Sequence, residues 1–111
     1  MKVAEILENK KAKDVTIINI EKLTVVADYF VICSATSSLQ VRALSDEVDE
    51  KLSAEGIEKI RQDGYRESRW IVMDYASVLV HIFHSEEREF YNIERLWSDA
   101  GNTMRFSVGE N

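Results

Sequence analysis

The sequence predicts an α/β domain with a mixed sheet of about five strands flanked by helices, in the order α-β-β-α-β-β-β-α. Short apolar runs rich in β-branched residues alternate with longer segments whose apolar residues recur every three or four positions. The length of 111 residues suits one domain, and an apolar share of 45% is typical of a globular chain. We therefore expect a single core.

The N-terminal third is predicted to contain one helix and two strands. Residues 1–11 form an amphipathic pattern with their apolar side chains on one side. Val15–Ile20 is β-branched and apolar, which favours a strand. Tyr29–Ser34 is apolar at nearly every position, as expected for a strand covered on both faces of its sheet.

The clearest helix signal follows Ser37. With Ser37 as N-cap, Gln40 falls at the third helical position, which is a capping-box arrangement. The next apolar residues, at spacings of three, four and four, are Val41, Leu44, Val48 and Leu52. This spacing predicts a buried stripe along one side, and Gly56 is expected to end the helix.

Three strands are predicted in the middle of the chain. Glu58–Asp63 is the weakest of them, and Trp70–Met73 and Val78–Phe83 are strong apolar runs. The link between the last two has only four residues, 74–77. So short a link predicts a hairpin, whose strands are antiparallel neighbours.

A last helix is predicted from Ser85, which would be its N-cap. Its inner side is expected to carry Phe90, Ile93 and Trp97. The domain would then span residues 1–97, followed by a loosely ordered tail over 98–111. Within that tail, Phe106 and Val108 are apolar and could dock back onto the domain.

Charge and hydropathy narrow the classes of partner. Lys and Arg total 14 against 20 Asp and Glu, a formal net charge of −6. Such a domain is repelled by phosphate backbones, so we expect little direct nucleic-acid contact and favour a basic protein partner. No signal-peptide pattern is present, and the longest apolar runs are too short to span a bilayer. No membrane association and a cytoplasmic location are therefore expected.

The residues that could carry chemistry give no coherent site. Cys33 is the only cysteine and is expected to be an inert core thiol. His81 and His84 are three apart on a predicted strand, so they would point to opposite faces rather than share a metal. The acidic positions of the central helix favour a solvated surface, and no glycine-rich phosphate loop occurs. We expect no catalytic residues, no metal site and no cofactor.

Trp70 and Tyr75 lie at the two ends of one short predicted strand. Two interpretations of Trp70 carry about equal weight: it is either a core residue or an exposed anchor for a partner. The second is favoured by the polar loop that precedes it, which contains Arg66, Glu67 and Arg69. An aromatic pair that flanks a short strand is typical of a protein interface.

Three stretches together resemble the ribosomal silencing factor family, also called the iojap-like family. They are ADYFVICSATSSLQVRALSDEV (Ala27–Val48), WIVMDYASVLVHIF (Trp70–Phe83) and REFYNIERLW (Arg88–Trp97). Their order and spacing match over most of residues 2–97. One departure occurs after the Asp-Tyr pair, where the family usually has Gly-Asp and this chain has Ala76-Ser77.

The resemblance implies both a fold and a function. The fold would be nucleotidyltransferase-like, without catalytic residues. The protein would be a translational repressor that binds the large ribosomal subunit through ribosomal protein fourteen and blocks joining of the small subunit when nutrients are scarce. By position, the partner-binding residues would be Trp70, Asp74 and Tyr75. The resemblance leaves self-association into a homodimer open.

Two alternatives are weighed against repression. An active nucleotidyltransferase would need paired carboxylates on a strand and a nearby Gly-Ser turn, and the sequence contains neither an Asp-x-Asp nor a Gly-Ser. A large-subunit assembly factor or scaffold would dock at the same place without silencing translation. Sequence patterns do not separate this second alternative from repression.

Overall fold

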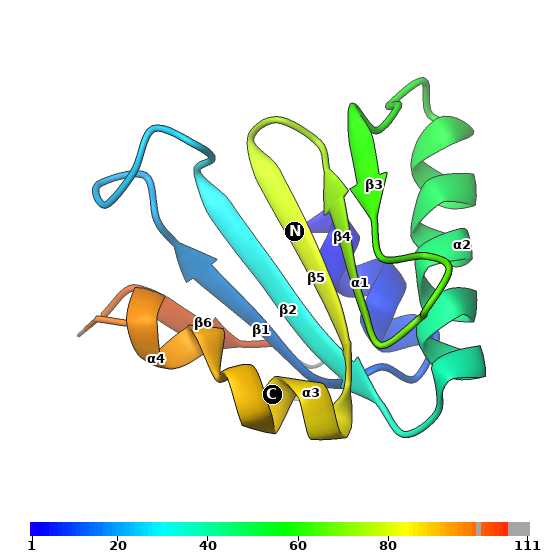
Figure 1. Ribbon diagram of the computed structural model, residues 1–111. Coiled ribbons are helices and arrows are strands. Elements are labelled where there is room, and N and C mark those ends of the chain that lie inside the picture. The colour runs from blue at the N-terminus through cyan, green and yellow to red at the C-terminus, as the bar shows by residue number, and fades with distance from the viewer. Residues whose placement is uncertain (100, 107–111) are drawn as a thin grey trace.

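The computed structural model describes residues 1–99 and 101–106 and contains a mixed sheet covered by helices (Figure 1). Within these residues the elements are α1 (Lys2–Asn9), β1 (Lys13–Asn19), β2 (Tyr29–Ala35), α2 (Ser38–Ser53), β3 (Arg61–Asp63), β4 (Trp70–Asp74), β5 (Val78–His84), α3 (Ser85–Tyr91), α4 (Ile93–Trp97) and β6 (Thr103–Arg105). The strands are ordered β3-β4-β5-β2-β1-β6. Only β2 and β5 pair in parallel among these described strands. The predicted α/β class with a mixed sheet is confirmed.

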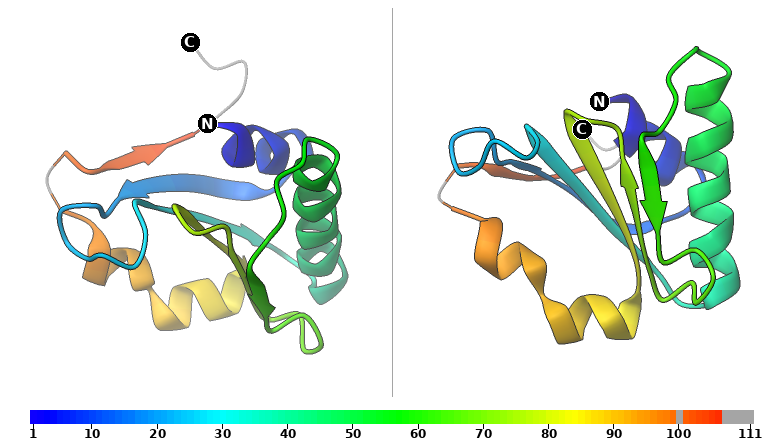
Figure 2. Two further views of the ribbon diagram at one scale, coloured as in Figure 1. Left: turned by 90° about the horizontal axis from the view of Figure 1, so that it is seen from above. Right: turned by 45° about the horizontal axis from the view of Figure 1, so that its top comes forward.

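The sheet separates two apolar clusters. Helices α1 and α2 cover one face, and α3 and α4 lie against the other (Figure 2). The larger cluster, toward α1 and α2, includes Leu7, Leu44 and Met73. The smaller cluster, toward α3 and α4, includes Ile32 and Phe83. Because β2 contributes buried residues to both clusters, its apolar character on both faces is explained.

Helix α2 begins as its sequence predicts. The Ser37 side-chain oxygen accepts a hydrogen bond from the Gln40 backbone N–H at 3.1 Å. The Gln40 side chain in turn accepts from the Thr36 N–H, one residue before the position that a standard capping box uses. The apolar stripe predicted for this helix is buried. After its end, Gly56 adopts φ +80°, a conformation that glycine reaches at little cost.

A β-bulge interrupts β1 near its start. Lys13 pairs with Ser34 and Thr16 pairs with Ile32, so the register shifts by one residue between them. Asp14 takes φ +50°, which is unusual for a residue other than glycine. A bulge leaves one residue without its ladder partners and turns its backbone groups away from the neighbouring strand. Other side chains must then satisfy the freed carbonyl groups.

The C-terminal part differs from its prediction. A sixth strand, β6, pairs antiparallel with β1 inside the segment for which a loosely ordered tail was expected. Phe106 packs against the larger cluster, as expected, and Val108 lies outside the described residues. The sequence signal was weak because all three β6 residues are exposed. The division of the chain at residue 97 stays a prediction.

The last predicted helix also differs in its details. Its N-cap is His84, whose Nδ1 accepts from the Glu86 N–H at 3.2 Å, and Ser85 is instead the first helical residue. Asn92, at φ +44°, breaks the expected helix into α3 and α4. Phe90 was predicted to face inward and is 79% exposed, because α3 turns the side with Ser85, Arg88 and Tyr91 to the strands and Phe90 lies off that side. Ile93 and Trp97 do pack inward.

The hairpin turn between β4 and β5 places a strained residue where the related family usually has glycine. Ala76 adopts φ +68°, which costs a residue with a Cβ atom about 1 kcal/mol. We expect Ala76→Gly to raise the free energy of unfolding by about 1 kcal/mol, or the melting temperature by about 4 °C. Thermal denaturation measures this. Ala54→Gly is the control, since Ala54 has an ordinary helical φ of −62° and should lose stability on the same change.

Candidate functional site

Strand β4 carries two different faces because successive side chains alternate. Ile71 and Met73 point into the larger cluster beneath α1 and α2 and are fully buried. Trp70, Val72 and Asp74 occupy the alternate positions and are half-buried. Trp70 and Asp74 therefore share a sheet face but lie at opposite ends of the strand.

Trp70 is held by the smaller cluster. Its ring stacks on Phe83, with centroids 4.7 Å apart, and lies 4.9 Å from the Tyr91 ring of α3. Its indole Nε1–H donates to His81 Nδ1 at 3.2 Å. These contacts fix the orientation of the ring while part of it stays accessible. Both interpretations of Trp70 thus have support: it packs against the core, and it is also a rigid, preorganised aromatic at the surface.

Asp74 builds the hairpin turn. Its Oδ1 accepts from the Ala76 N–H at 2.8 Å, and its Oδ2 lies 4.0 Å from Arg61 Nη2. A carboxylate that accepts from the backbone two residues onward is typical of tight turns. Its side chain is only 24% exposed, and the hydrogen bond from the Ala76 N–H commits one of its oxygens to the turn. A partner contact through Asp74 stays a prediction.

Tyr75 follows β4 and turns toward the opposite sheet face. It packs against the larger cluster, and its hydroxyl is buried with no hydrogen-bond partner among the described residues. Burial, with smaller contributions from Asp49 and Glu58, raises the pKa of Tyr75 to about 12. The hydroxyl is therefore a neutral donor at physiological pH. The structure does not bring Tyr75 together with Trp70.

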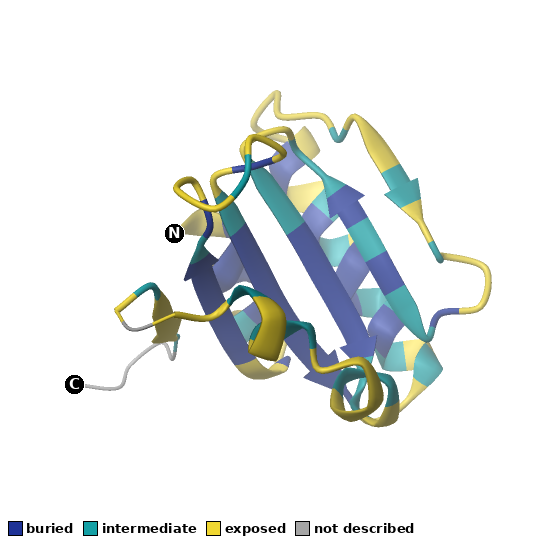
Figure 3. Ribbon diagram, turned by 60° about the vertical axis from the view of Figure 1, so that its left-hand side comes forward, coloured by how far each residue is buried: buried dark blue, intermediate teal, exposed yellow. Residues whose placement is uncertain are grey.

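The accessible part of the smaller-cluster side lies over β4 and β5, beyond the end of these strands that α3 borders (Figure 3). We call this surface the Trp70 face and define it by Trp70, Val72, Asp74 and Leu79, all half-buried. Tyr91, which is 48% exposed, borders it from α3. Sequence reasoning missed Val72, Leu79 and Tyr91. Strand alternation from Trp70 gives Val72, whereas Tyr91 depends on how α3 folds back.

The one cysteine is placed as the sequence predicts. Cys33 is fully buried, and burial raises the pKa of its thiol to about 12, which makes it unreactive. Within the described residues, no three histidine, cysteine or carboxylate side chains gather closely enough to hold a metal ion. No helix in the same part of the chain has the length and apolar character that a membrane span requires.

His81 is buried beneath the Trp70 face among the rings of Phe30, Trp70 and Phe83. Burial lowers its pKa to about 4. Above pH 6.5 the neutral His81 contributes fully to the stability of the folded state. This contribution falls as the pH drops toward 4, because over that range only the unfolded chain takes up the proton. Between pH 6.5 and pH 4, we expect the free energy of unfolding to fall by about 3 kcal/mol more in wild type than in His81→Gln. Urea titrations at both pH values measure the difference; parallel losses would contradict it.

Fold and site define a small α/β domain in which a tryptophan held by its neighbours is part of an accessible sheet face. A sequence model of the family described as "Ribosomal silencing factor during starvation" matches residues 1–110. The ribosomal silencing factor of Bacillus subtilis is 40% identical over 93 residues, which cover 84% of this chain and 79% of that protein. The chain belongs to the ribosomal silencing factor family.

Solved structures agree with this assignment. A crystal structure of a protein from Chromobacterium violaceum superposes with a TM-score of 0.83 at 33% identity, covering 86% of this chain and 81% of that one. Another, from Bacillus halodurans, has a TM-score of 0.81 at 35% identity and covers 95% of both chains. The predicted family is confirmed, and with it the class of protein, a ribosomal silencing factor and not an enzyme.

Proposed function

We propose that this chain represses translation in the cytoplasm by binding the large ribosomal subunit through ribosomal protein fourteen. Bound there, it blocks joining of the small subunit and lowers protein synthesis when nutrients are scarce. The proposed contact residues are Trp70 and Asp74 on the Trp70 face, with Tyr75 at the end of the hairpin. The family and the charge of the chain support the proposal.

One observation carries the proposal: the Trp70 ring is held by its neighbours while part of it stays accessible, and the stretch of β4 and β5 beyond it carries no helix (Figure 3). Ordering a side chain on binding costs free energy, and a ring already fixed by its neighbours avoids much of that cost. Aromatic residues of this kind are frequent energetic centres of protein interfaces. Trp70 is therefore suited to be the central contact of a protein partner.

Electrostatics favour a protein surface over ribosomal RNA. With a net charge of −6, the domain has no overall attraction for a phosphate backbone. Near the Trp70 face, Arg69 is paired with Glu86 and Glu87, which neutralises its charge locally. A basic ribosomal protein would gain from long-range attraction to this domain, mainly through faster association.

Co-sedimentation tests the partner directly. We expect the protein to sediment with large ribosomal subunits and not with small ones, at a ratio near one. With large subunits that lack ribosomal protein fourteen, none of the protein studied should co-sediment. Binding should weaken moderately as salt rises, without the steep dependence of a phosphate-binding protein. Equal recovery with both subunits, or full recovery without ribosomal protein fourteen, would contradict the proposal.

A further inference from the structure

Helices α3 and α4 lie on the sheet with little apolar burial of their own. None of their residues, all of them described, is fully buried. Phe90 and Leu96 are 79% and 78% exposed, and only Ile93 and Trp97 pack on the smaller cluster. Hydrophobic burial alone therefore holds this segment weakly. Its position depends on polar contacts to the strands.

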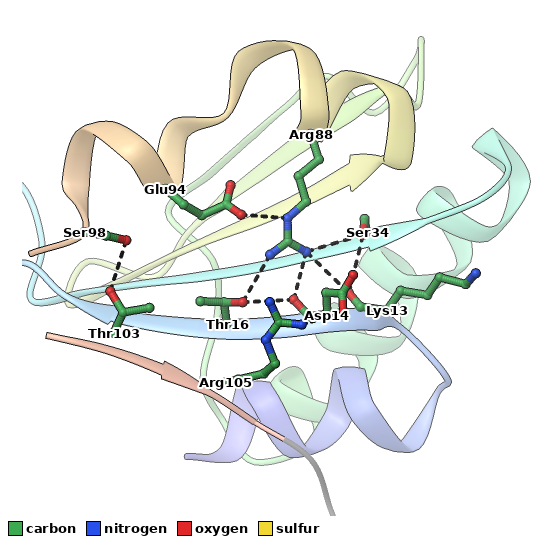
Figure 4. A network of polar contacts seen from close by, with 9 residues as sticks. All are labelled: Lys13, Asp14, Thr16, Ser34, Arg88, Glu94, Ser98, Thr103 and Arg105. Carbon is green, nitrogen blue, oxygen red and sulfur yellow. Dashed lines mark hydrogen bonds and ion pairs between the residues drawn. The ribbon is translucent and has the colours of Figure 1, made fainter. Parts of the chain in front are cut away.

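The largest set of such contacts belongs to Arg88 (Figure 4). The Arg88 side chain is 11% exposed, and its guanidinium group lies over the β-bulge of β1. Its Nη1 donates to the Asp14 carbonyl oxygen at 2.8 Å and to Ser34 Oγ at 3.3 Å, and its Nη2 donates to Thr16 Oγ1 at 3.1 Å. The bulge frees the Asp14 carbonyl oxygen, which regular strand pairing would occupy, and the two hydroxyl oxygens lie close to it. A planar guanidinium can satisfy several such acceptors at once.

Arg88 also joins α3 to α4. Its Nε donates to Glu94 Oε2 at 3.0 Å, across the break at Asn92. A charge-assisted bond in a position this poorly exposed is stronger than an ordinary surface pair. The Arg88 side chain thus fixes three segments relative to one another: the bulged strand β1, α3 and the first turn of α4.

Two contact routes lead from this segment to Trp70. Tyr91, one helical turn after Arg88, lies 4.9 Å from the Trp70 ring. Trp97 of α4 packs edge-on against Phe30 at 5.1 Å, and Phe30 packs against His81, which accepts the Trp70 indole N–H. The orientation of Trp70 therefore depends on where α3 and α4 lie.

We infer that Arg88 is a positioning residue for the Trp70 face: it anchors α3 and α4 on the β1 bulge so that Tyr91 and Trp97 hold Trp70 in its binding orientation. The claim that Arg88 fixes the orientation of Trp70 concerns only this chain. The effect on partner binding rests on the proposed function, because it assumes that Trp70 contacts the ribosomal partner.

Fluorescence tests the claim about Trp70 orientation without the ribosome. The chain has two tryptophans, so Trp97→Phe leaves Trp70 as the sole reporter. In that background, Arg88→Ala should move Trp70 emission to longer wavelength and increase its quenching by acrylamide, under conditions where circular dichroism shows a folded protein. Arg88→Lys should give nearly the same change, since an ammonium group cannot reproduce the planar fork. Glu94→Gln, a milder change, should shift emission less and in the same direction.

Arg105→Ala is the matched control. Arg105 also contacts Asp14, through the carboxylate at 2.8 Å, but it belongs to β6 and is 70% exposed. Removing it should leave Trp70 emission unchanged. Unchanged emission in the folded Arg88 variants, or full restoration by lysine, would overturn the inference.

Binding to large subunits separates this inference from the proposed function. We expect Arg88→Ala to weaken binding about tenfold and Arg105→Ala to leave it within about twofold, since loss of preorganisation alone costs affinity. A shift in Trp70 emission with no effect on subunit binding would overturn the claim that Arg88 serves the binding face. If wild type itself does not bind large subunits, the proposed function fails, and the emission result still decides the positioning role.

Discussion

Replacing Trp70 with alanine is expected to weaken binding to the large ribosomal subunit at least about 30-fold, or about 2 kcal/mol, the loss typical of a central interface aromatic. The same change removes the stacking on Phe83 and the hydrogen bond to His81. We therefore also expect a fall of about 2 kcal/mol in the free energy of unfolding, less than a fully buried tryptophan would cost. Binding titrations and urea denaturation on the same protein give both values.

Trp70→Phe is the control for this experiment. Phenylalanine keeps an aromatic ring that can stack on Phe83 but cannot donate to His81. It should retain most of the stability and part of the affinity. If Trp70→Ala strongly lowers the melting temperature while the folded fraction binds as tightly as wild type, Trp70 is a core residue only and the proposed surface is wrong.

The largest expected loss of stability comes from Gly64→Ala. Gly64 has φ +85°, and a Cβ atom there would lie 2.0 Å from the backbone carbonyl oxygen of Trp70. The atoms that this Cβ would meet are backbone atoms of β4, so either the turn at Gly64 or the first residue of β4 must shift, and both shifts are costly. We expect the free energy of unfolding to fall by about 3 kcal/mol or more, measured by urea denaturation. Affinity for the large subunit should fall as well, because the displaced residue is Trp70.

Gly56→Ala provides the matched comparison. Gly56 has nearly the same backbone conformation, φ +80°, but a Cβ atom there would meet nothing within 4 Å. Its substitution should cost only the conformational strain of about 1 kcal/mol and leave binding unchanged. Similar losses at the two glycines would mean that the close approach to Trp70 does not determine stability at this position.

The elements with strong local signals were predictable from the sequence. The hairpin over 70–83 has two apolar runs and a short link, and α2 has both a cap at Ser37 and a regular apolar stripe. The features that the sequence did not predict lack such signals. Strand β6 is three exposed residues, and the bulge at Asp14 follows from tertiary contacts that no local pattern contains. His84 replaced Ser85 as the cap because β5 continues through His84.

The central residue of the candidate site could be predicted from the sequence, but the residues that surround it could not. Trp70 was recognisable as an aromatic beside a polar loop, but the alternation of β4 separates it from Tyr75, which packs on the opposite face. Tyr91 and Arg88 act on Trp70 through the path of α3 and α4, which depends on the break at Asn92. Sequence spacing does not reveal a contact that depends on such a break.

Subunit joining followed by light scattering tests the central claim most directly, with a titration of wild type and Trp70→Ala. A binding protein without turnover can act only by occupancy, so inhibition by wild type should saturate near one copy per large subunit. Protein added before the small subunit should inhibit more than protein added after joining. Trp70→Ala should lose inhibition in proportion to its lost affinity. Inhibition at a small fraction of the ribosome concentration, or undiminished joining by saturated large subunits, would contradict the account.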